Sequence, residues 1–401
     1  MTSWMNRLFG AKPGSEPLRA AERKSAAPML AFHHPGRGFF GEVSGLGLVR
    51  AGYHRNPVVH RCVRLIAEAG ASVPLTLTLD GAEVKSHPVE KLLERPNPRE
   101  SGMEMLDQVY MHLLLFGNAY LNAVSDGESV RELYALRPDR VSVIAGPDGW
   151  PVAYDYSAGV RTSRVSIEGE GIAPILHLKL ADPMEDHRGF APLSAALVPL
   201  EMHEAASRWN KALLDNSARP SGALVYASPE NLTDAQFDRL KVELESAFSG
   251  QGNAGRPLLL EGGLDWKPLA LSPKDMDFQE ARNSAAREIA LAFGVPPLLL
   301  GLPGDNTYSN YAEANRAFWR QAIVPMVRRV STAMAQWLQP GFQGRISIQP
   351  DLDQIEALGE DRAALWKRVG EASFLSDDEK RQALGYGTAA EATAGKRSTS
   401  Q

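Results

Sequence analysis

The chain of 401 residues contains one cysteine, Cys62. A single cysteine cannot form an intramolecular disulfide bond, and it cannot supply the thiolates of a cysteine-based zinc site. We therefore interpret Cys62 as a small buried side chain on a helix. The sequence also lacks an apolar run of the ~18 residues that a membrane-spanning helix needs, and its first residues do not follow the pattern of a signal peptide. We expect a protein of a cytoplasm-like compartment that does not enter membranes.

Basic residues are not in excess. The 43 Lys and Arg residues are outnumbered by 48 Asp and Glu residues, so the formal net charge is −5. A protein that holds nucleic acid tightly by neutralising phosphates needs a surplus of cationic side chains on one face. The composition therefore argues against tight nucleic-acid binding. It remains compatible with a protein past which DNA slides, because a neutral or acidic wall repels the phosphate backbone.

Motifs of catalysis are also missing. The sequence has no P-loop and no nucleophile elbow, and the pair His203 and Glu204 lacks the second histidine of a zinc protease. One group of side chains before the helix expected at Pro192 could form a metal or acid/base site: Asp182, Glu185, Asp186 and His187. We favour a solvated turn there, because a helix N-terminus stabilises nearby acidic groups. We accordingly assign no catalytic residue, no metal and no cofactor.

The two ends of the chain differ from its middle. Residues 1–50 are rich in Gly, Pro, Ala and basic residues, and residues 387–401 are mostly small and polar. Both compositions predict segments without a fixed structure, namely a mobile N-terminal arm and a disordered tail. Between them, helical and strand patterns alternate, which predicts an α+β fold with two or three structural units.

Local signals define the elements of the first half. Asn56 followed by Pro57 predicts the start of a helix that ends at Gly70. Asp80-Gly81 predicts a tight turn, and Ser101 with Glu104 forms the capping box of a second helix that stops at Gly117. Strand-like runs are expected at 73–79, 119–124, 130–136, 141–145, 151–156 and 175–180. The last five of these runs predict a β meander.

Long helical patterns dominate the second half. Residues 192–217 predict one helix that Pro199 should bend. A β-α-β-β insert of roughly fifty residues, the size of a small module, leads into a helix that ends at Phe293. Residues 311–338 predict another long helix, which Pro325 should kink. The expected C-terminal elements are a strand at 345–349 and two short helices at 352–369 and 377–384, the second capped by Ser376 and Glu379 and stopped by Gly385.

A leucine-rich loop between Gly294 and Asn310 is the most informative segment. Loops normally lie in water and carry polar residues, yet this loop contains four leucines between its Pro and Gly residues. Either other parts of the chain cover these leucines, or the leucines line a surface built by several chains. The four residues are Leu298, Leu299, Leu300 and Leu302.

The order of these features resembles the portal proteins of tailed phages over roughly residues 45–350. Ala191 stands where the family usually has Ser at the entry to its first stem helix. The motifs that carry the resemblance are Asn56 to Val59 with Cys62 to Glu68, Arg95 to Pro98, Leu115 to Tyr120, Arg188 to Leu193, Asn216 to Gly222, Phe293 to Pro297 with Gly301, and Tyr308 to Asn310. The compact size is similar to siphophage-type portals and to the portal of a phage-like gene transfer agent.

The resemblance implies a portal fold. Its expected parts are a mobile N-terminal arm at 1–50, an α/β wing at 51–190, stem helix 1 at 191–217, a small α/β clip at 218–273, stem helix 2 at 274–293, a tunnel loop at 294–310, a kinked wing helix and strand at 311–350, a helical crown at 351–386 and a disordered tail at 387–401. The implied function is a ring, typically dodecameric, at the capsid vertex of a virion assembled in the bacterial cytoplasm. The ring conducts double-stranded DNA during packaging and ejection, and it is not an enzyme.

The family also implies partners and site residues. The expected partners are the terminase large subunit, the major capsid protein and a head–tail adaptor. Residues expected to face DNA in the tunnel loop are Pro303, Gly304, Asp305, Asn306, Thr307, Tyr308 and Ser309, and residues expected to dock motor or adaptor on the clip are Arg256, Glu261, Asp265 and Trp266. Only Asp305 in this loop is charged, which favours sliding over gripping.

Two other functions stay open at this point. One is a metal-dependent, nucleic-acid-processing enzyme that uses the residues at 182–187, and the other is a head–tail adaptor of the same virion. A series of arginines on the last long helix resembles a DNA-binding stripe, but the four do not share one face. We expect intersubunit ion pairs or a solvated face for Arg316, Arg320, Arg328 and Arg329.

Overall fold

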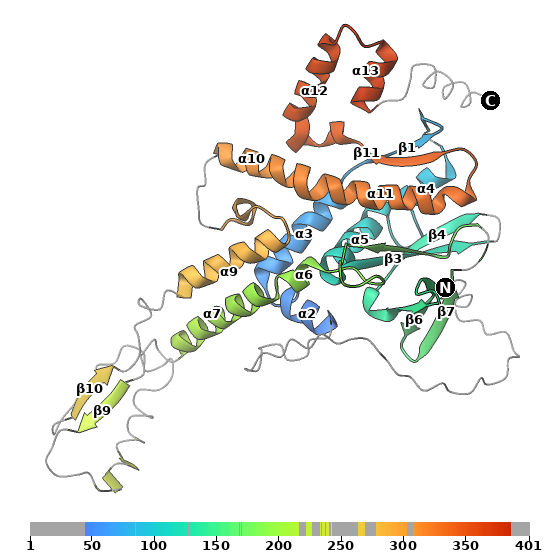
Figure 1. The fold of residues 1–401 in the computed structure, drawn as a ribbon. Coiled ribbons are helices and arrows are strands. Elements are labelled where there is room, and N and C mark those ends of the chain that lie inside the picture. Colours follow the sequence, from blue (N-terminus) through green and yellow to red (C-terminus); the bar gives the residue numbers. More distant parts are fainter. Residues whose placement is uncertain are drawn as a thin grey trace, which may run out of the picture. The chain divides into compact units, whose positions relative to one another are not determined.

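The computed structural model mixes helices and sheets, as expected from the sequence (Figure 1). It describes residues 45–84, 86–126, 129–167, 169, 171–215, 222–226, 233, 235–236, 238–239, 242, 264–268, 278–302 and 308–385. The chain divides into two compact units. The first unit combines Met1–Ala195 with Ala290–Gln401, and the second is Ala196–Ile289.

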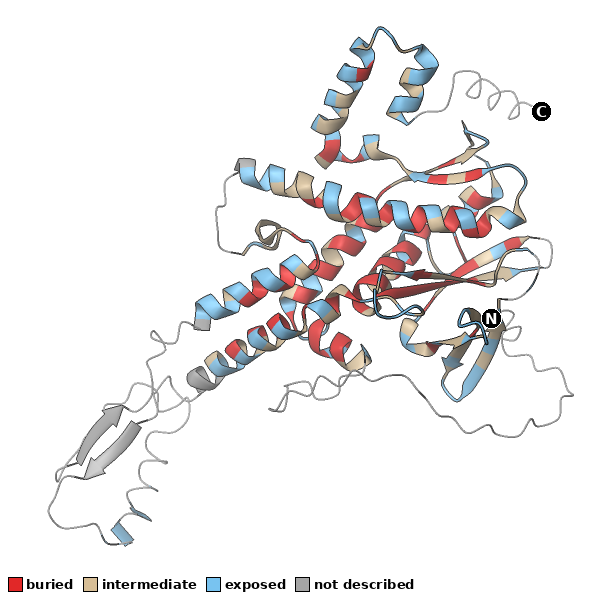
Figure 2. Ribbon diagram, viewed as in Figure 1, coloured by how far each residue is buried: buried red, intermediate tan, exposed pale blue. Residues whose placement is uncertain are grey.

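A pair of helices forms the centre of the first unit. Helix α3 (Pro57–Ala71) packs against helix α5 (Gly102–Phe116), and the faces that meet are buried (Figure 2). Cys62 is fully buried in α3, as predicted, and burial raises the pKa of its thiol to about 12. At the edge of the pair, Arg64 donates to Asp107 across the two helices at 2.8 Å. The predicted capping box of Ser101 and Glu104 is present at the start of α5.

The N-cap of α3 is formed as predicted. The Asn56 side chain accepts hydrogen bonds from the backbone N–H groups of Val58 (3.0 Å) and Val59 (3.2 Å). We expect Asn56→Ala to lower the free energy of unfolding by about 1 to 2 kcal/mol, because two N–H groups at a buried helix start lose their acceptor. Asn56→Asp keeps the acceptor and should retain most of this stability. Urea denaturation tests both variants, and an equal loss in Asp and Ala would contradict the capping role.

Two short helices were not predicted. Helix α2 (Gly45–Gly52) lies within the segment expected to be a mobile arm, and its Leu48 and Val49 are buried. That expectation is therefore wrong for residues 45–50, which belong to a short apolar helix that contacts α6 (Pro192–Ala195). The three glycines of α2 are untypical of a helix, so the sequence did not indicate it. Residues 1–44 lie outside the described residues. The second unpredicted helix is α4 (Pro88–Glu94), which the His87 ring caps by accepting from the N–H of Val89.

The expected β meander is instead two separate three-stranded sheets. Sheet β4-β3-β8 and sheet β5-β6-β7 share no strand pair among the described residues. Their strands are β3 (Asn118–Ser125), β4 (Val130–Leu136), β8 (Ile175–Lys179), β5 (Val141–Ala145), β6 (Pro151–Ala158) and β7 (Arg161–Ser166). Strand β7 was missed because its sequence is polar and carries no apolar alternation. It is held by backbone pairing with β6.

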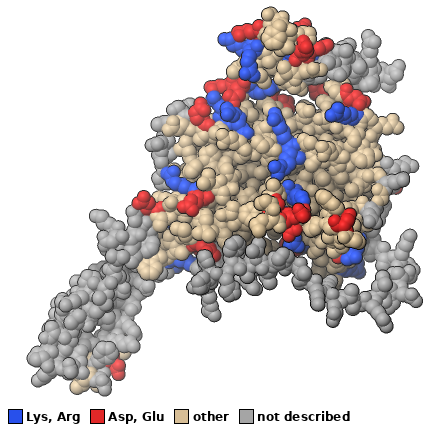
Figure 3. All heavy atoms as spheres, viewed as in Figure 1, with Lys and Arg blue, Asp and Glu red and all other residues tan. Residues whose placement is uncertain are grey.

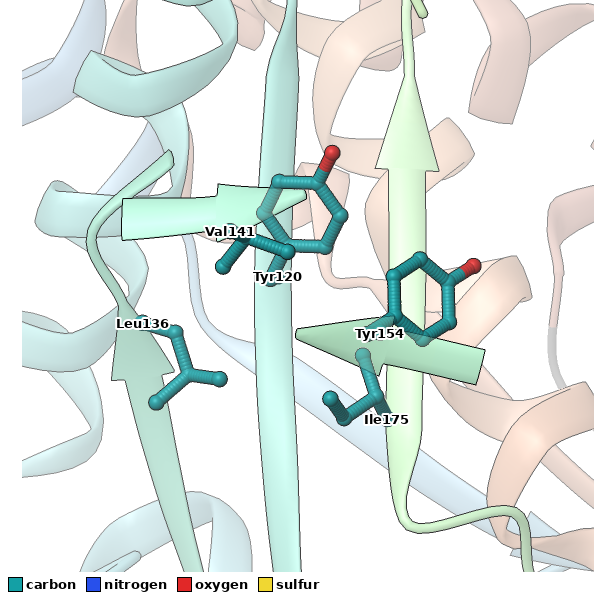
Figure 4. Close-up of a cluster of buried hydrophobic side chains, with 5 residues drawn as sticks. All are labelled: Tyr120, Leu136, Val141, Tyr154 and Ile175. Carbon is teal, nitrogen blue, oxygen red and sulfur yellow. The ribbon is translucent and has the colours of Figure 1, made fainter. Parts of the chain in front are cut away.

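A hydrophobic cluster joins these two sheets (Figure 4). All five of its buried members come from different strands. They are Tyr120 of β3, Leu136 of β4, Val141 of β5, Tyr154 of β6 and Ile175 of β8. The two sheets are therefore held together by the burial of these side chains and not by hydrogen bonds between strands, as a single meander would be.

The third sheet joins two distant parts of the sequence. Strand β1 (Leu75–Leu79) pairs with β2 (Ala82–Glu83) on one side and with β11 (Ile346–Pro350) on the other. The turn between β1 and β2 has positive φ angles at both central residues, Asp80 (51°) and Gly81 (89°). This matches the predicted Asp-Gly hairpin turn, because type I′ turns need positive φ at both positions.

The long C-terminal helix, which Pro325 was expected to kink, runs without a break and widens into a π-helical turn just before the proline. Helix α10 (Tyr308–Phe318) passes into a π-helical turn (Trp319–Ile323) and then into α11 (Val324–Leu338). The Val324 N–H donates to the Trp319 carbonyl, five residues back. Pro325 has no N–H for a normal helical bond, so the chain widens just before it.

Of the two short C-terminal helices, the first needed a correction at its start and the second did not. The helix expected at 352–369 begins with two 3₁₀ turns, Leu352–Gln354 and Glu356–Leu358, and only then continues as α12 (Gly359–Glu371). Helix α13 (Asp377–Leu384) has its predicted capping box and its predicted stop at Gly385.

The second unit is described through two helices and one strand pair. The helix predicted from Pro192 stops at Ala195 and restarts as α7 (Leu197–Asp215), so the expected bend is a break. Pro199 explains it, because its missing N–H cannot bond the Ala195 carbonyl. Strand β9 (Gly222–Tyr226) pairs with β10 (Leu264–Pro268), and α9 (Phe278–Ala292) leads back to the first unit. The remaining insert elements predicted at 233–260 lie largely outside the described residues.

Candidate functional site around the leucine-rich loop

The leucine-rich loop has a defined backbone up to Leu302. Gly294 ends α9 with a φ of 69°, and the Val295 N–H donates to the Ala290 carbonyl at 2.9 Å. Pro297–Leu300 then form a 3₁₀ turn that Gly301 closes with a φ of 70°. Glycine is suited to both ends, because other residues rarely adopt positive φ. The segment from Gly294 to Gly301 is therefore a compact turn with a positive-φ glycine at each end.

The loop leucines are only half-buried. Each of the four is covered in part by other residues, and the 3₁₀ turn contacts α3 and α10. The chain thus covers part of the apolar surface that the sequence analysis singled out. The rest of that surface stays exposed in the single chain.

Few of the predicted site residues can be located. Pro303 to Thr307 in the loop, and Arg256 and Glu261 in the insert, lie outside the described residues. Tyr308 and Ser309 form the first turn of α10. Asp265 and Trp266 lie in β10, opposite Val225 and Leu224 of β9. The roles assigned to these residues stay predictions.

Ion pairs connect α10 and the π-helical turn to α12. Arg316 pairs with Glu360 and lies 3.9 Å from Asp361, and Arg320 lies 3.7 Å from Asp361. We had expected intersubunit ion pairs or a solvated face for these two arginines. They instead pair within the chain, because the 3₁₀ turns at 352–358 bring the start of α12 back to α10. Arg328 and Arg329 are exposed on α11.

We expect Arg316→Gln to lower the free energy of unfolding by less than about 1 kcal/mol at low salt. The effect should shrink further at about 1 M NaCl, because the pairs are partly exposed and salt screens them. Urea denaturation at low and high salt measures it, with Arg329→Gln as the matched control on α11. A loss of equal size at both salt concentrations would contradict an electrostatic role.

A buried polar junction links β3, β8 and the segment before α6, and the sequence analysis did not find it. The side-chain oxygen of Asn118, at the start of β3, accepts hydrogen bonds from the Gly189 N–H (2.8 Å) and from His177 Nε2 (2.9 Å). The side-chain N–H₂ group of Asn118 donates to the carbonyl oxygens of Phe116 (2.7 Å) and Gly189 (3.3 Å). The motif that ends α5 is thereby tied to the segment that precedes α6. Each of these two motifs can be recognised in the sequence, but no local pattern predicts that residues 71 positions apart meet.

His177 is enclosed by aromatic rings in this junction. Its ring stacks on Tyr120 with centroids 4.3 Å apart, and Tyr154 meets it edge-on at 5.8 Å. Burial, helped by the charges of Lys179 and His187, lowers the pKa of His177 to about 4. The ring is therefore neutral at pH 7, with Nε2 as the donor to Asn118.

The segment Arg95 to Pro98, one of those that carry the resemblance, also has a structural role. Asn97 is 3% exposed, and its amide donates to the Leu133 carbonyl at 2.9 Å. Its oxygen accepts from the N–H groups of Arg99 (2.9 Å) and Glu100 (3.1 Å). The motif thus fixes the turn before α5 onto strand β4.

The acidic segment at 182–187 forms turns. The Asp182 carboxylate accepts the Met184 N–H at 2.9 Å, and the Glu185 carboxylate accepts the His187 N–H at 3.1 Å. Within the described residues, no group of three or more His, Cys, Asp or Glu side chains is placed to hold a metal ion. No described helix is both long and apolar enough to cross a membrane.

Comparison with known proteins gives a consistent result. Residues 57–385 match the family of phage portal proteins. A protein of Rickettsia bellii (strain RML369-C) with no assigned function is 41% identical over 83% of this chain and 87% of its own length. A probable portal protein of Streptomyces phage phiC31 is 29% identical over 81% of this chain and 73% of its own. A chain from the neck of a native gene transfer agent particle, solved with C12 symmetry, is 49% identical over 88% of this chain and 96% of its own, with a TM-score of 0.67.

Proposed function

The chain belongs to the phage portal protein family, and we propose that it forms a closed ring at one vertex of a phage head or of a gene transfer agent particle. The proposal rests on the 49% identity to a chain of a particle neck solved with C12 symmetry. Copies related by rotation meet through heterologous contacts, which close into a ring when the rotation closes. Twelve copies agree with that symmetry.

In this function the ring surrounds double-stranded DNA, and the loop from Pro303 to Ser309 faces it. Asp305 is the only charged residue of that loop, and the whole chain has a net charge of −5. Such a wall lets DNA pass, since tight binding would need several cationic contacts to phosphate. The half-buried leucines of the adjoining turn fit the same arrangement, because neighbouring copies would cover them.

The proposed partners dock at different parts of the chain. We assign the second compact unit to the clip and most of the stem. The clip, with Arg256, Glu261, Asp265 and Trp266, is the proposed docking site for the terminase large subunit and later for a head–tail adaptor. We assign the wing (residues 51–190 with 311–350) and the crown (residues 351–386) to the first unit. The major capsid protein is the third proposed partner. The terminase supplies the power stroke, and we assign no catalysis to this chain.

The first test is the mass of the purified full-length protein. Native mass spectrometry, with negative-stain images, should show a ring of about a dozen copies with a central hole. A folded monomer that forms no ring, even when co-expressed with its capsid protein, would contradict the proposal.

A second test addresses the conduit. Particles made with Pro303 to Thr307 replaced by a Gly-Ser segment of equal length should still contain the ring but protect much less DNA from nuclease. A matched control alters the exposed turn at Gly149, which lies outside the proposed tunnel loop. Equal DNA protection in both variants would contradict a tunnel role for the loop.

A further inference from the structure

Helix α7 has apolar residues on two faces, and the described part of the chain buries only one of them (Figure 2). On the first face, Leu200 is fully buried and Ala206 is 6% exposed. On the second, Val198 is 60% exposed and Met202 is 47% exposed. A helix that packs on one side normally presents polar residues on its other side, because large apolar side chains are costly in water. The second face of α7 therefore indicates a contact that the single chain does not make.

The exposed apolar residues of α7 have the spacing of a seam between two packed helices. Steps of four, three and four residues separate them, and at about 100° per residue they lie within an arc of about 60°. None of them is charged, and Met and Trp are enriched in the cores of protein interfaces. We call them the α7 stripe: Val198, Met202, Ala205 and Trp209.

The charged residues of α7 form a third face, which lies between the buried face and the stripe. Glu201, Glu204 and Lys211 belong to it, together with Arg208, which donates to Glu204 at 2.7 Å. Charged side chains of this kind are stable in water and need no partner protein. Of the three faces of α7, the stripe is thus the one that gains from a contact with another molecule.

Helix α9 presents an exposed line of residues with the same spacing. Its members are again separated by four, three and four residues, whereas Ala285, Ala286 and Ile289 form the buried side of this helix. Ser284 is small and lies between two longer side chains of the line, so a larger side chain can pack over it. We call this surface the α9 line: Glu280, Ser284, Arg287 and Leu291.

The two helices run in opposite directions within one copy (Figure 1). They come close at His203 of α7 and Arg282 of α9, since burial, with the nearby charge of Arg282, lowers the pKa of the His203 ring. When the axis of a ring runs along these helices, rotation keeps every residue at its level. Helix α7 of one copy then lies antiparallel to α9 of the next copy, with the residues near 203 and 282 at the same level.

The charges of the two surfaces are complementary in this arrangement. Glu201 and Arg208 border the α7 stripe and are seven residues apart, and Glu280 and Arg287 of the α9 line have the same separation. Antiparallel helices bring Glu201 to Arg287, within about one helical turn of the same level. The same register brings Arg208 to Glu280. A parallel arrangement would bring like charges together, so the antiparallel contact is the attractive one.

We propose that the α7 stripe of one copy packs on the α9 line of the next copy and so joins the second units of the ring. The inference rests on the proposed ring and adds the surfaces that join its copies. A closed ring needs two different surfaces of one chain that fit each other, and the stripe and the line form such a pair.

Nucleic acid is a poorer occupant of the stripe than a second copy, because the stripe has no cationic residue. Acidic and basic side chains are also interspersed on the face shown in Figure 3, which is untypical of a surface that binds nucleic acid.

Cysteine labelling of the full-length protein tests whether the stripe is covered in the ring. Cys62 is fully buried, so an introduced thiol is the one that reacts with a maleimide. In rings, the thiol of Ala205→Cys should react about tenfold or more slowly than in diluted monomers, because an interface core excludes water. Lys211→Cys is the matched control on the charged face of the same helix, and its rate should change by less than about twofold on assembly.

Met202→Asp tests whether the contact holds the ring together. A carboxylate in the stripe must lose its water when two copies pack, so half-assembly should need about tenfold or more protein. Native mass spectrometry over a dilution series measures this concentration. Lys211→Asp is the matched control and should shift it by less than about threefold. Both residues are exposed in the single chain, so urea denaturation should show equal stabilities of the two monomers.

A charge exchange tests the assignment to α9. Glu201→Arg should raise the concentration for half-assembly by about threefold or more, because it places two cations opposite each other. Adding Arg287→Glu should restore most of the loss, because opposite charges then meet again. No recovery in the double variant would overturn the pairing of α7 with α9.

The remaining outcomes also decide the proposal. Rings of Met202→Asp that form as readily as wild-type rings would overturn this contact and leave the proposed ring standing. A wild-type protein that forms no ring would overturn the proposed function and this contact together. A thiol of Ala205→Cys that is already protected in monomers would assign the stripe to a contact within the chain. A thiol protected only in complete particles would assign the stripe to a different protein, and both results overturn the proposal.

Discussion

Replacing Gly117 with alanine is expected to lower the free energy of unfolding by more than about 3 kcal/mol. Gly117 has a φ of 70°, which costs any other residue backbone strain. A Cβ atom there would also lie 2.3 Å from the Gly189 carbonyl oxygen and 2.6 Å from its carbon. These are backbone atoms held by Asn118, so the clash cannot be relieved by a side-chain rotation.

The matched control is Gly149→Ala. Gly149 also has a positive φ, 84°, but no atom lies within 4 Å of the position that its Cβ would take. This variant should lose only the strain term of about 1 to 2 kcal/mol. Urea denaturation of both variants measures the difference, which reports the contact between Gly117 and Gly189. Equal losses would show that this contact does not stabilise the fold.

Elements with local signals could be predicted from the sequence. The caps of α3, α5 and α13 and the Asp80-Gly81 turn depend on side chains within three residues of the backbone groups that they bond. Such local hydrogen bonds do not depend on how the rest of the chain folds. An irregularity in the helix at Pro325 was also predictable, because proline lacks a donor in every context; its form, a π-helical turn over Trp319–Ile323, was not.

The arrangement of these elements depends on contacts that no local pattern encodes. Five strand runs in sequence suggested one meander, but the cluster around Tyr120 and Tyr154 shows that they form two sheets that share a core. The ion pairs of Arg316 likewise depend on the path of the chain through residues 352–358. Sequence patterns predict which segments are ordered, whereas tertiary packing decides which segments meet.

The candidate site was only partly accessible to the same reasoning. The leucine-rich loop was found because an apolar loop violates a general rule. The junction of Asn118, His177 and Gly189 was missed because each residue is unremarkable alone. The role of this junction becomes visible only in the fold, where the residues after α5 meet the segment before α6. We expect the stability of the fold to depend on pH through His177 in this junction.

Acidification is expected to weaken the fold through His177. The pKa of this group is lowered from 6.5 to about 4, mainly by burial, so the unfolded chain takes up the proton first as the pH falls. Stability is therefore unaffected by this group above pH 6.5 and decreases as the pH falls from 6.5 towards 4. The loss over this window is about 2 to 3 kcal/mol, allowing for the partial exposure of the ring.

His177→Gln separates this group from the others. His112 on α5 also has its pKa lowered to about 4 by burial, so the wild-type pH dependence has more than one source. Glutamine keeps an N–H donor for Asn118 but does not titrate, so the difference between the two proteins isolates His177. Urea denaturation at pH 7.5, 6.5, 5.5 and 4.5 (about one unit apart) should show that the variant is less stable than the wild type at pH 7.5 and that the gap narrows at pH 4.5. Parallel curves of unfolding free energy against pH would mean that the protonation of His177 does not affect the stability of the fold. A narrowing gap would mean that the fold disfavours the protonated ring of His177, so that the proton taken up by the unfolded chain lowers the stability of the wild type as the pH falls.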